Sequence, residues 1–258
     1  MDTSHSGSGV AANAAAVTSA QKPLYPRTTV AGPLHTVVVL LILGTWAYFG
    51  RIMAAHMRAE ILPNRMYFYL RTFVTEWVVF FFVLYGVWRH GTSTQDLLGP
   101  RWKKAGQLFR DLGIACVFEL ISLIVLGVVA HLLHAGTATA DVGFMMPANA
   151  AEICMWVALS VTAGICEETI FRGYLLRQFS GWARSATVGV IVSSLMFGAC
   201  HIYQGTKHAI VIAIYGSLFA MLAVLRRSTK PGMIAHGLQD GGAGILYFIA
   251  TRLKLPGM

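Results

Sequence analysis

The chain has 258 residues, of which 56% are hydrophobic and only 12% are charged, with a formal net charge of +9. Soluble proteins carry about 25% charged residues, so the composition predicts a membrane protein and excludes an ordinary soluble domain. The basic residues stand between apolar runs, as Lys and Arg do in the cytoplasmic loops of membrane proteins. The positive net charge is therefore expected of a protein embedded in the lipid bilayer, and no nucleic-acid partner is predicted.

Residues 1–33 are rich in Ala, Ser, Thr and Gly and are predicted to form a disordered N-terminal tail. Seven apolar runs follow, each near the roughly 20 residues that a membrane-spanning helix requires. The predicted fold is therefore all-α, a polytopic transmembrane bundle of about seven spanning helices. The runs lie near 34–55, 66–88, 112–133, 149–176, 185–204, 208–226 and 231–251.

Basic residues alternate between the connections of these runs. They gather in 89–111, 177–184 and 226–230, whereas 134–148 has no Lys or Arg. This alternation predicts a multi-pass protein of the cell membrane with its N-terminus in the cytoplasm. Arg51, Arg58 and Arg65, in the first connection, do not fit this alternation, and the alternative for that segment is an interfacial helix in place of a simple external loop.

The segment Cys166–Tyr174, CEETIFRGY, places three ionisable residues next to an apolar run. Glu168 and Arg172 are four residues apart and share a helix face, so they are expected to pair. Glu167 points about 100° away from Glu168 and has no basic residue one turn along. An unpaired carboxylate in apolar surroundings suits a general base. The alternative is that both glutamates flank a helix end near the lipid headgroups.

Two further segments carry polar residues within apolar sequence. His201 closes the run SSLMFGACH, and His236 shares a helix face with Asp240. Together with Glu167 they predict a polar pocket that either polarises a water for hydrolysis or binds a divalent metal. The other acidic residues in spans, Glu76 and Glu119, have no helical partner. They could pair with arginines, line a cavity or sit protonated, and are not assigned to catalysis.

These segments resemble the motifs of the CAAX protease and bacteriocin-processing (CPBP/Abi) family, which includes the type II CAAX prenyl endopeptidases. The motif E-E-x-x-x-R is matched by Glu167, Glu168 and Arg172, F-x-x-x-H by Phe197 and His201, and H-x-x-x-N by His236 and, as Asp, Asp240. The resemblance covers about residues 149–245. It implies an intramembrane endopeptidase of the glutamate type, a hydrolase, with transmembrane helices at 34–148 followed by a catalytic helical core at 149–251.

By this resemblance, Glu167 would activate the water with help from His201, and His236 and Asp240 would stabilise the oxyanion. Glu168, Arg172 and Phe197 would shape the site. An ionised Asp240 cannot donate a hydrogen bond as Asn does, so it is protonated, ligates a metal, or orients His236. We expect no metal or other cofactor, although Glu, His and Asp are good ligands for a divalent ion.

The substrate is expected to be a membrane-associated protein or peptide, prenylated or of the bacteriocin type. A non-catalytic immunity or scaffold protein of the same fold, or a proton-coupled transporter, is the alternative.

The predicted turn at 177–184 also bears on the depth of the site. It would place Glu167 about 10 residues and His201 about 17 residues from the turn, so the two side chains would differ in depth by roughly 10 Å.

Overall fold

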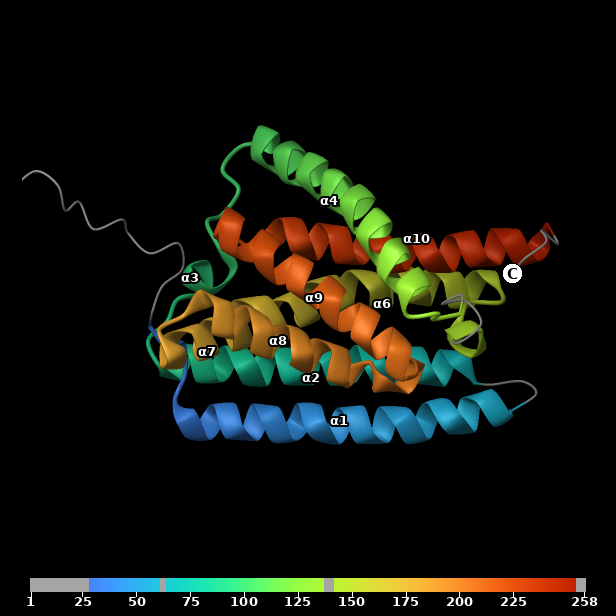
Figure 1. The fold of residues 1–258 in the computed structure, drawn as a ribbon, viewed down its shortest axis with the longest axis horizontal. Helices are drawn as coiled ribbons and strands as arrows, with labels where there is room; N and C mark the ends of the chain where they lie inside the picture. The colour runs from blue at the N-terminus through green and yellow to red at the C-terminus, as the bar shows by residue number, and fades with distance from the viewer. Residues whose placement is uncertain (1–27, 61–63, 137–141, 254–258) are drawn as a thin grey trace, which may run out of the picture.

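The structure is a computed structural model that describes residues 28–60, 64–136 and 142–253 (Figure 1). The regular elements within these described ranges are all helices, which confirms the predicted all-α fold. The helices are α1 (Pro33–Ala59), α2 (Arg65–Arg89), α3 (Thr94–Leu98), α4 (Ala105–Leu132), α6 (Ala150–Glu168), α7 (Leu176–Ala183), α8 (Ala186–Cys200), α9 (Thr206–Arg226) and α10 (Lys230–Arg252). A π-helix, Thr169–Leu175, joins α6 to α7, and short 3₁₀ turns lie at Gly143–Met145 and Ile202–Gln204.

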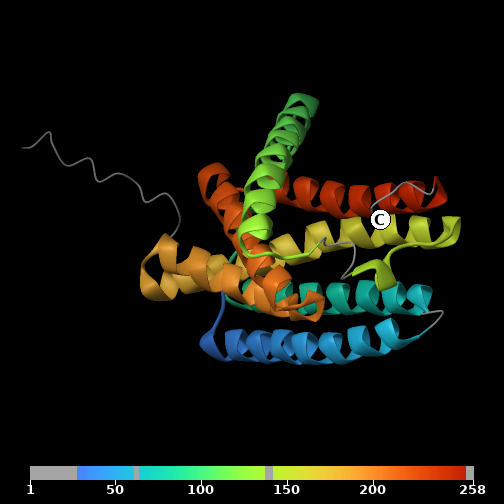
Figure 2. The same cartoon turned by 45° about the vertical axis from the view of Figure 1, so that its right-hand side comes forward.

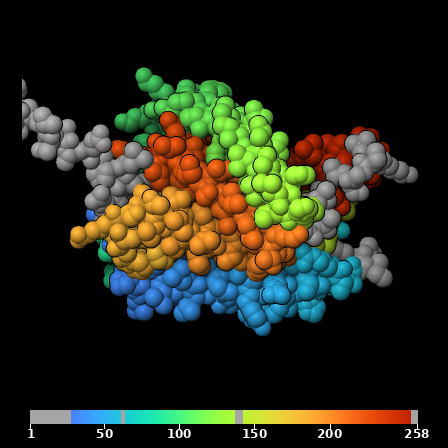
Figure 3. Space-filling view, viewed as in Figure 1, coloured from blue at the N-terminus to red at the C-terminus, as the bar shows by residue number. Residues whose placement is uncertain are grey.

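Helix α6 is the central element of the bundle. It packs against α10 and α2, and α1 lies beside α2 on the outside, as Figures 1 and 2 show from two directions. Helix α9 packs on α8, and α4 crosses obliquely over α9 and α10. Figure 3 shows α4 lying over the outer face of α9. The polar segments of α6, α8 and α10 are thus brought together inside the bundle.

Most of the predicted N-terminal tail lies outside the described residues, which begin at residue 28. Val30 and Ala31, within the predicted tail, are buried. Their backbone N–H groups donate to Gln178 Oε1 at 2.9 and 3.0 Å, and Gln178 Nε2 donates to the Ala31 carbonyl oxygen at 2.9 Å. These buried hydrogen bonds fix the chain ahead of Pro33 to the bundle.

The predicted number of spans requires a correction. Within the described residues, five helices are long and apolar enough to cross a membrane: α1, α2, α4, the continuous helix Ala150–Ala183, and α9. Helix α8 has 15 residues, about 22 Å, which is shorter than the roughly 30 Å hydrocarbon core. Helix α10 has its predicted position but does not qualify as an apolar span, because its first half carries His236, Gln239 and Asp240.

The predicted turn at 177–184 is also corrected, because the helix continues to Ala183. Arg177, expected in this turn, is instead buried and donates to the Asp96 carbonyl oxygen. Glu167 lies 16 positions before Ala183, and His201 lies 15 positions after Ala186. The two side chains are therefore at nearly equal distances from the turn, and the expected depth mismatch is absent.

The interface between α6 and α10 depends on glycine. A Cβ atom on Gly164 would lie 2.5 Å from the Met233 carbonyl oxygen and 3.0 Å from the Gly237 nitrogen. Gly164→Ala is therefore expected to push α10 away and to destabilise the protein by about 1–3 kcal/mol. The measurement is the midpoint of thermal unfolding in detergent. Gly113→Ala in α4 is the control, because a Cβ there meets nothing within 4 Å. Equal midpoints for the two variants would contradict this account of the interface.

Candidate active site

Two adjacent glutamates at the end of α6 face different surroundings. Glu168 is fully buried, and its Oε1 lies 2.7 Å from Arg172 Nη1, so the predicted ion pair is present. Arg172 is fully buried as well, and its Nη2 donates to the Gly216 carbonyl oxygen at 3.1 Å. Glu167 instead lines a cavity, and its Oε2 has no hydrogen-bond partner among the described residues.

The backbone is a π-helix directly after these glutamates. All residues from Thr169 to Leu175 are buried in this wider helix. A π-helical insertion within an α-helix often accompanies a functional site. The pairing of Glu168 with Arg172 persists across the change of helix type, which the sequence pattern did not predict.

His236 of α10 lies between two carboxylates. Its Nδ1 is 3.2 Å from Glu168 Oε1, and its Nε2 is 3.4 Å from Asp240 Oδ2. An ionised carboxylate can only accept hydrogen bonds, so both ring nitrogens of His236 are held as donors. Of the three roles left open for Asp240, this geometry favours the one in which it orients His236.

The motif of α8 places an aromatic ring and a histidine beside this group. The Phe197 ring lies 4.2 Å from the Arg172 guanidinium carbon, a cation–π contact. His201 Nδ1 is 2.8 Å from the Phe197 carbonyl oxygen. A carbonyl only accepts, so Nδ1 carries the hydrogen and Nε2 of the neutral ring keeps its lone pair. His201 can therefore accept a proton or a hydrogen bond from water through Nε2.

A cavity of about 900 Å³ connects these residues. All four predicted catalytic residues line it: Glu167, His201, His236 and Asp240. Phe197 also lines the cavity, whereas Glu168 and Arg172 lie behind its wall. The structure thus brings the predicted set together around one space, with the predicted ion pair as its support.

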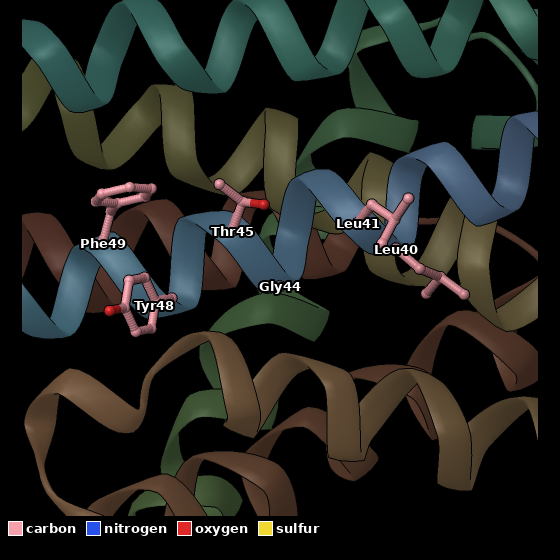
Figure 4. Close-up of a pocket in the computed structure, with 6 residues that line it drawn as sticks. All are labelled: Leu40, Leu41, Gly44, Thr45, Tyr48 and Phe49. Carbon is pink, nitrogen blue, oxygen red and sulfur yellow. The ribbon is translucent and has the colours of Figure 1, made fainter.

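The remaining wall is mainly apolar and includes helices outside the three motifs. Leu41, Thr45 and Phe49 of α1 line the cavity and also belong to a smaller, open pocket on that helix. Figure 4 shows this pocket, formed by Leu40, Leu41, Gly44, Thr45, Tyr48 and Phe49. The cavity therefore extends from the polar residues to the lipid-facing part of the bundle.

The cavity also contains polar residues that the motifs did not identify. Glu76 of α2 and Glu119 of α4 both line it, which is one of the three roles predicted for them. Glu119 Oε1 accepts a hydrogen bond from Tyr215 at 2.7 Å. Tyr203 and His208 line the cavity as well. An acidic residue within an apolar span was the signal for the two glutamates, whereas Tyr203 and His208 had none.

The side chains do not form an evident metal centre. Among the described residues, no three His, Cys, Asp or Glu side chains lie close enough together to hold a metal ion. The absence of a metal cofactor stays a prediction, because side chains can move when an ion binds.

Comparison with known families agrees with the motifs. The family model described as Type II CAAX prenyl endopeptidase Rce1-like matches residues 149–242, a stretch that contains every predicted site residue. Comparisons with curated proteins and with solved structures gave no match. The family match supports a membrane protease acting on a protein or peptide at the membrane. The match over residues 149–242 thus confirms the predicted resemblance of this chain to the CAAX protease and bacteriocin-processing family.

Proposed function

We propose that the chain is an intramembrane endopeptidase that hydrolyses a peptide bond of a membrane-associated substrate with an activated water. The observation that carries the proposal is the joint position of Glu167 and His201 on one cavity. Glu167 Oε2 has no hydrogen-bond partner in the described part of the chain, and His201 presents Nε2 as an acceptor. A water between them would meet two proton acceptors and no covalent nucleophile is needed.

In the proposed reaction, Glu167 removes a proton from the water as its oxygen attacks the carbonyl carbon of the substrate. The tetrahedral intermediate then collapses, the C–N bond breaks, and Glu167 returns the proton to the leaving amine. His201 fixes the water through Nε2. His236 contributes positive charge near the developing oxyanion, and Asp240 orients it.

Glu168, Arg172 and Phe197 are assigned to positioning. Glu168 Oε1 contacts Arg172 within one continuous helix, and the same atom lies 3.2 Å from His236 Nδ1, a contact that connects α6 to α10. The Phe197 ring on Arg172 ties α8 to the same group. A displacement of the catalytic groups by about 1 Å can lower the rate about 10²-fold, so the reaction depends on these three residues holding them in place.

The cavity favours a substrate with an apolar part. Its walls combine the polar groups with side chains of α1, α4 and α9 such as Phe49, Leu123 and Ile212. Both a prenylated peptide and a bacteriocin-type leader with an apolar segment fit this description. We assign no metal or other cofactor to the reaction.

The proposal is tested with the full chain in lipid nanodiscs. The probes are a fluorogenic peptide ending in a farnesylated CAAX sequence and the same peptide without the farnesyl group. Cleavage that persists in a chelator and is lost with Glu167→Gln is the expected result. In parallel, membranes containing either protein are compared for shifted proteolytic fragments, which detects a bacteriocin-type substrate. Equal fragments and no peptide cleavage would reject the peptidase, and loss of cleavage in chelator would reject the metal-free mechanism.

A further inference from the structure

Glu76 is a buried carboxyl that the three motifs leave without a role. It lies on α2, is 2% exposed, and its Oε2 has no hydrogen-bond partner among the described residues. It lines the same cavity as Glu167. A buried polar atom without a partner is costly unless something in the cavity satisfies it.

Within residues 28–60, 64–136 and 142–253, neither of these two carboxyls forms an ion pair. Glu168 pairs with Arg172, and His236 lies against Asp240, so the charges of these four groups cancel when His236 is protonated. Arg71 lines the cavity but makes no ion pair within 4 Å to Glu76 or Glu167. Two ionised carboxyls that share a low-dielectric space repel each other, and a proton held by one of them removes this repulsion.

The hydrogen-bond donors of the motif residues near Glu167 already have acceptors, which again directs attention to Glu76. His236 directs both ring nitrogens to carboxylates, and His201 directs Nδ1–H to the Phe197 carbonyl. Asp240, as a carboxylate, only accepts. The set predicted from the motifs therefore has no uncommitted donor for a substrate carbonyl oxygen, although hydrolysis requires one where the oxyanion forms.

We propose that Glu76 is a further catalytic residue: its protonated carboxyl, sharing the cavity with ionised Glu167, donates a hydrogen bond to the scissile carbonyl oxygen. This inference rests on the proposed peptidase function. As Glu167 takes the proton of the attacking water, the oxyanion forms against the Glu76 O–H. Glu76 keeps its proton when the carbonyl re-forms, and the leaving amine takes the proton held by Glu167. No other reactant is needed.

Substitutions of Glu76 distinguish a role as hydrogen-bond donor from a role as a negative charge. Glu76→Gln keeps an N–H donor and no charge, so it is expected to retain kcat within about 10-fold of wild type. Glu76→Met and Glu76→Leu remove the donor and are expected to lower kcat about 10²–10³-fold. Both apolar variants relieve the burial of a carboxyl, so unfolding midpoints at or above that of wild type are expected. The farnesylated peptide in nanodiscs is the probe.

Tyr203 provides the competing donor and the control. Its hydroxyl oxygen accepts a hydrogen bond from Gln204 Nε2 at 3.1 Å, and Tyr203 lines the cavity. Tyr203→Phe is expected to leave kcat within a few-fold of wild type. If Tyr203→Phe is the variant that loses about 10²-fold while Glu76→Met stays active, the proposal is overturned. It is equally overturned if Glu76→Gln loses as much as Glu76→Met.

The outcomes also separate this inference from the proposed function. If Glu167→Gln abolishes cleavage and Glu76→Met does not reduce it, the peptidase stands and the role of Glu76 fails. If wild type and Glu167→Gln behave identically, the peptidase itself fails and the inference falls with it.

Discussion

Glu167→Gln is expected to lower kcat for peptide cleavage by about 10⁴-fold, the upper range for loss of a general base. Glutamine has the shape of glutamate, but its amide cannot take a proton from water. The fold is expected to persist, because Glu167 Oε2 makes no hydrogen bond in the described structure. Initial rates on the farnesylated peptide and the unfolding midpoint in the same nanodiscs measure the two quantities separately.

Glu119→Gln is the matched control for this variant. Glu119 lines the same cavity and accepts a hydrogen bond from Tyr215, which the carbonyl oxygen of a glutamine also accepts. Its rate is expected to stay near that of wild type.

His201→Ala is expected to lower kcat by about 10²–10³-fold, in the same direction as Glu167→Gln, because the water loses one of its two acceptors. Full turnover by Glu167→Gln would remove Glu167 as the base and leave the fold assignment untouched.

Contacts within one helix were predictable from the sequence. The spacing of Glu168 and Arg172 and that of His236 and Asp240 place each pair on one face, and both pairs form. These contacts need only the helical repeat and not the arrangement of the bundle. The order of the three motifs then indicated which helices would share a pocket, before any packing was known.

Contacts between helices were not predictable in the same way. The approach of His236 to Glu168 depends on the close packing of α10 against Gly164, which no spacing encodes. Glu76 was visible as an acid within an apolar span, but only the packing of α2 on α6 brings it to the cavity. The extent of α7 was missed because Arg177 suggested a loop, whereas its charge is buried against the Asp96 carbonyl.

Glu168→Gln is expected to destabilise the protein by about 3–5 kcal/mol, because it removes the negative charge from a buried ion pair. The side chains of Glu168 and Arg172 are each 1% exposed, so solvent does not screen the lost charge. Glu60→Gln is the control, since Glu60 is exposed at the end of α1 and surface changes of this kind stay within about 0.5 kcal/mol. Unfolding in mixed detergent measures both.

A second substitution shows whether the loss comes from the buried charge of Arg172. Arg172→Met added to Glu168→Gln removes the buried charge and leaves a thioether against the rings of Phe197 and Phe219, which lie 4.2 and 5.0 Å from the guanidinium carbon. The double variant is expected to regain at least half of the lost stability, because replacing both members of a buried pair is often nearly neutral. Additive losses would mean that the pair carries no coupling. Peptide cleavage is expected to stay low in the double variant. His236 Nδ1 then faces the amide of Gln at position 168, and the negative charge that fixed its N–H is gone.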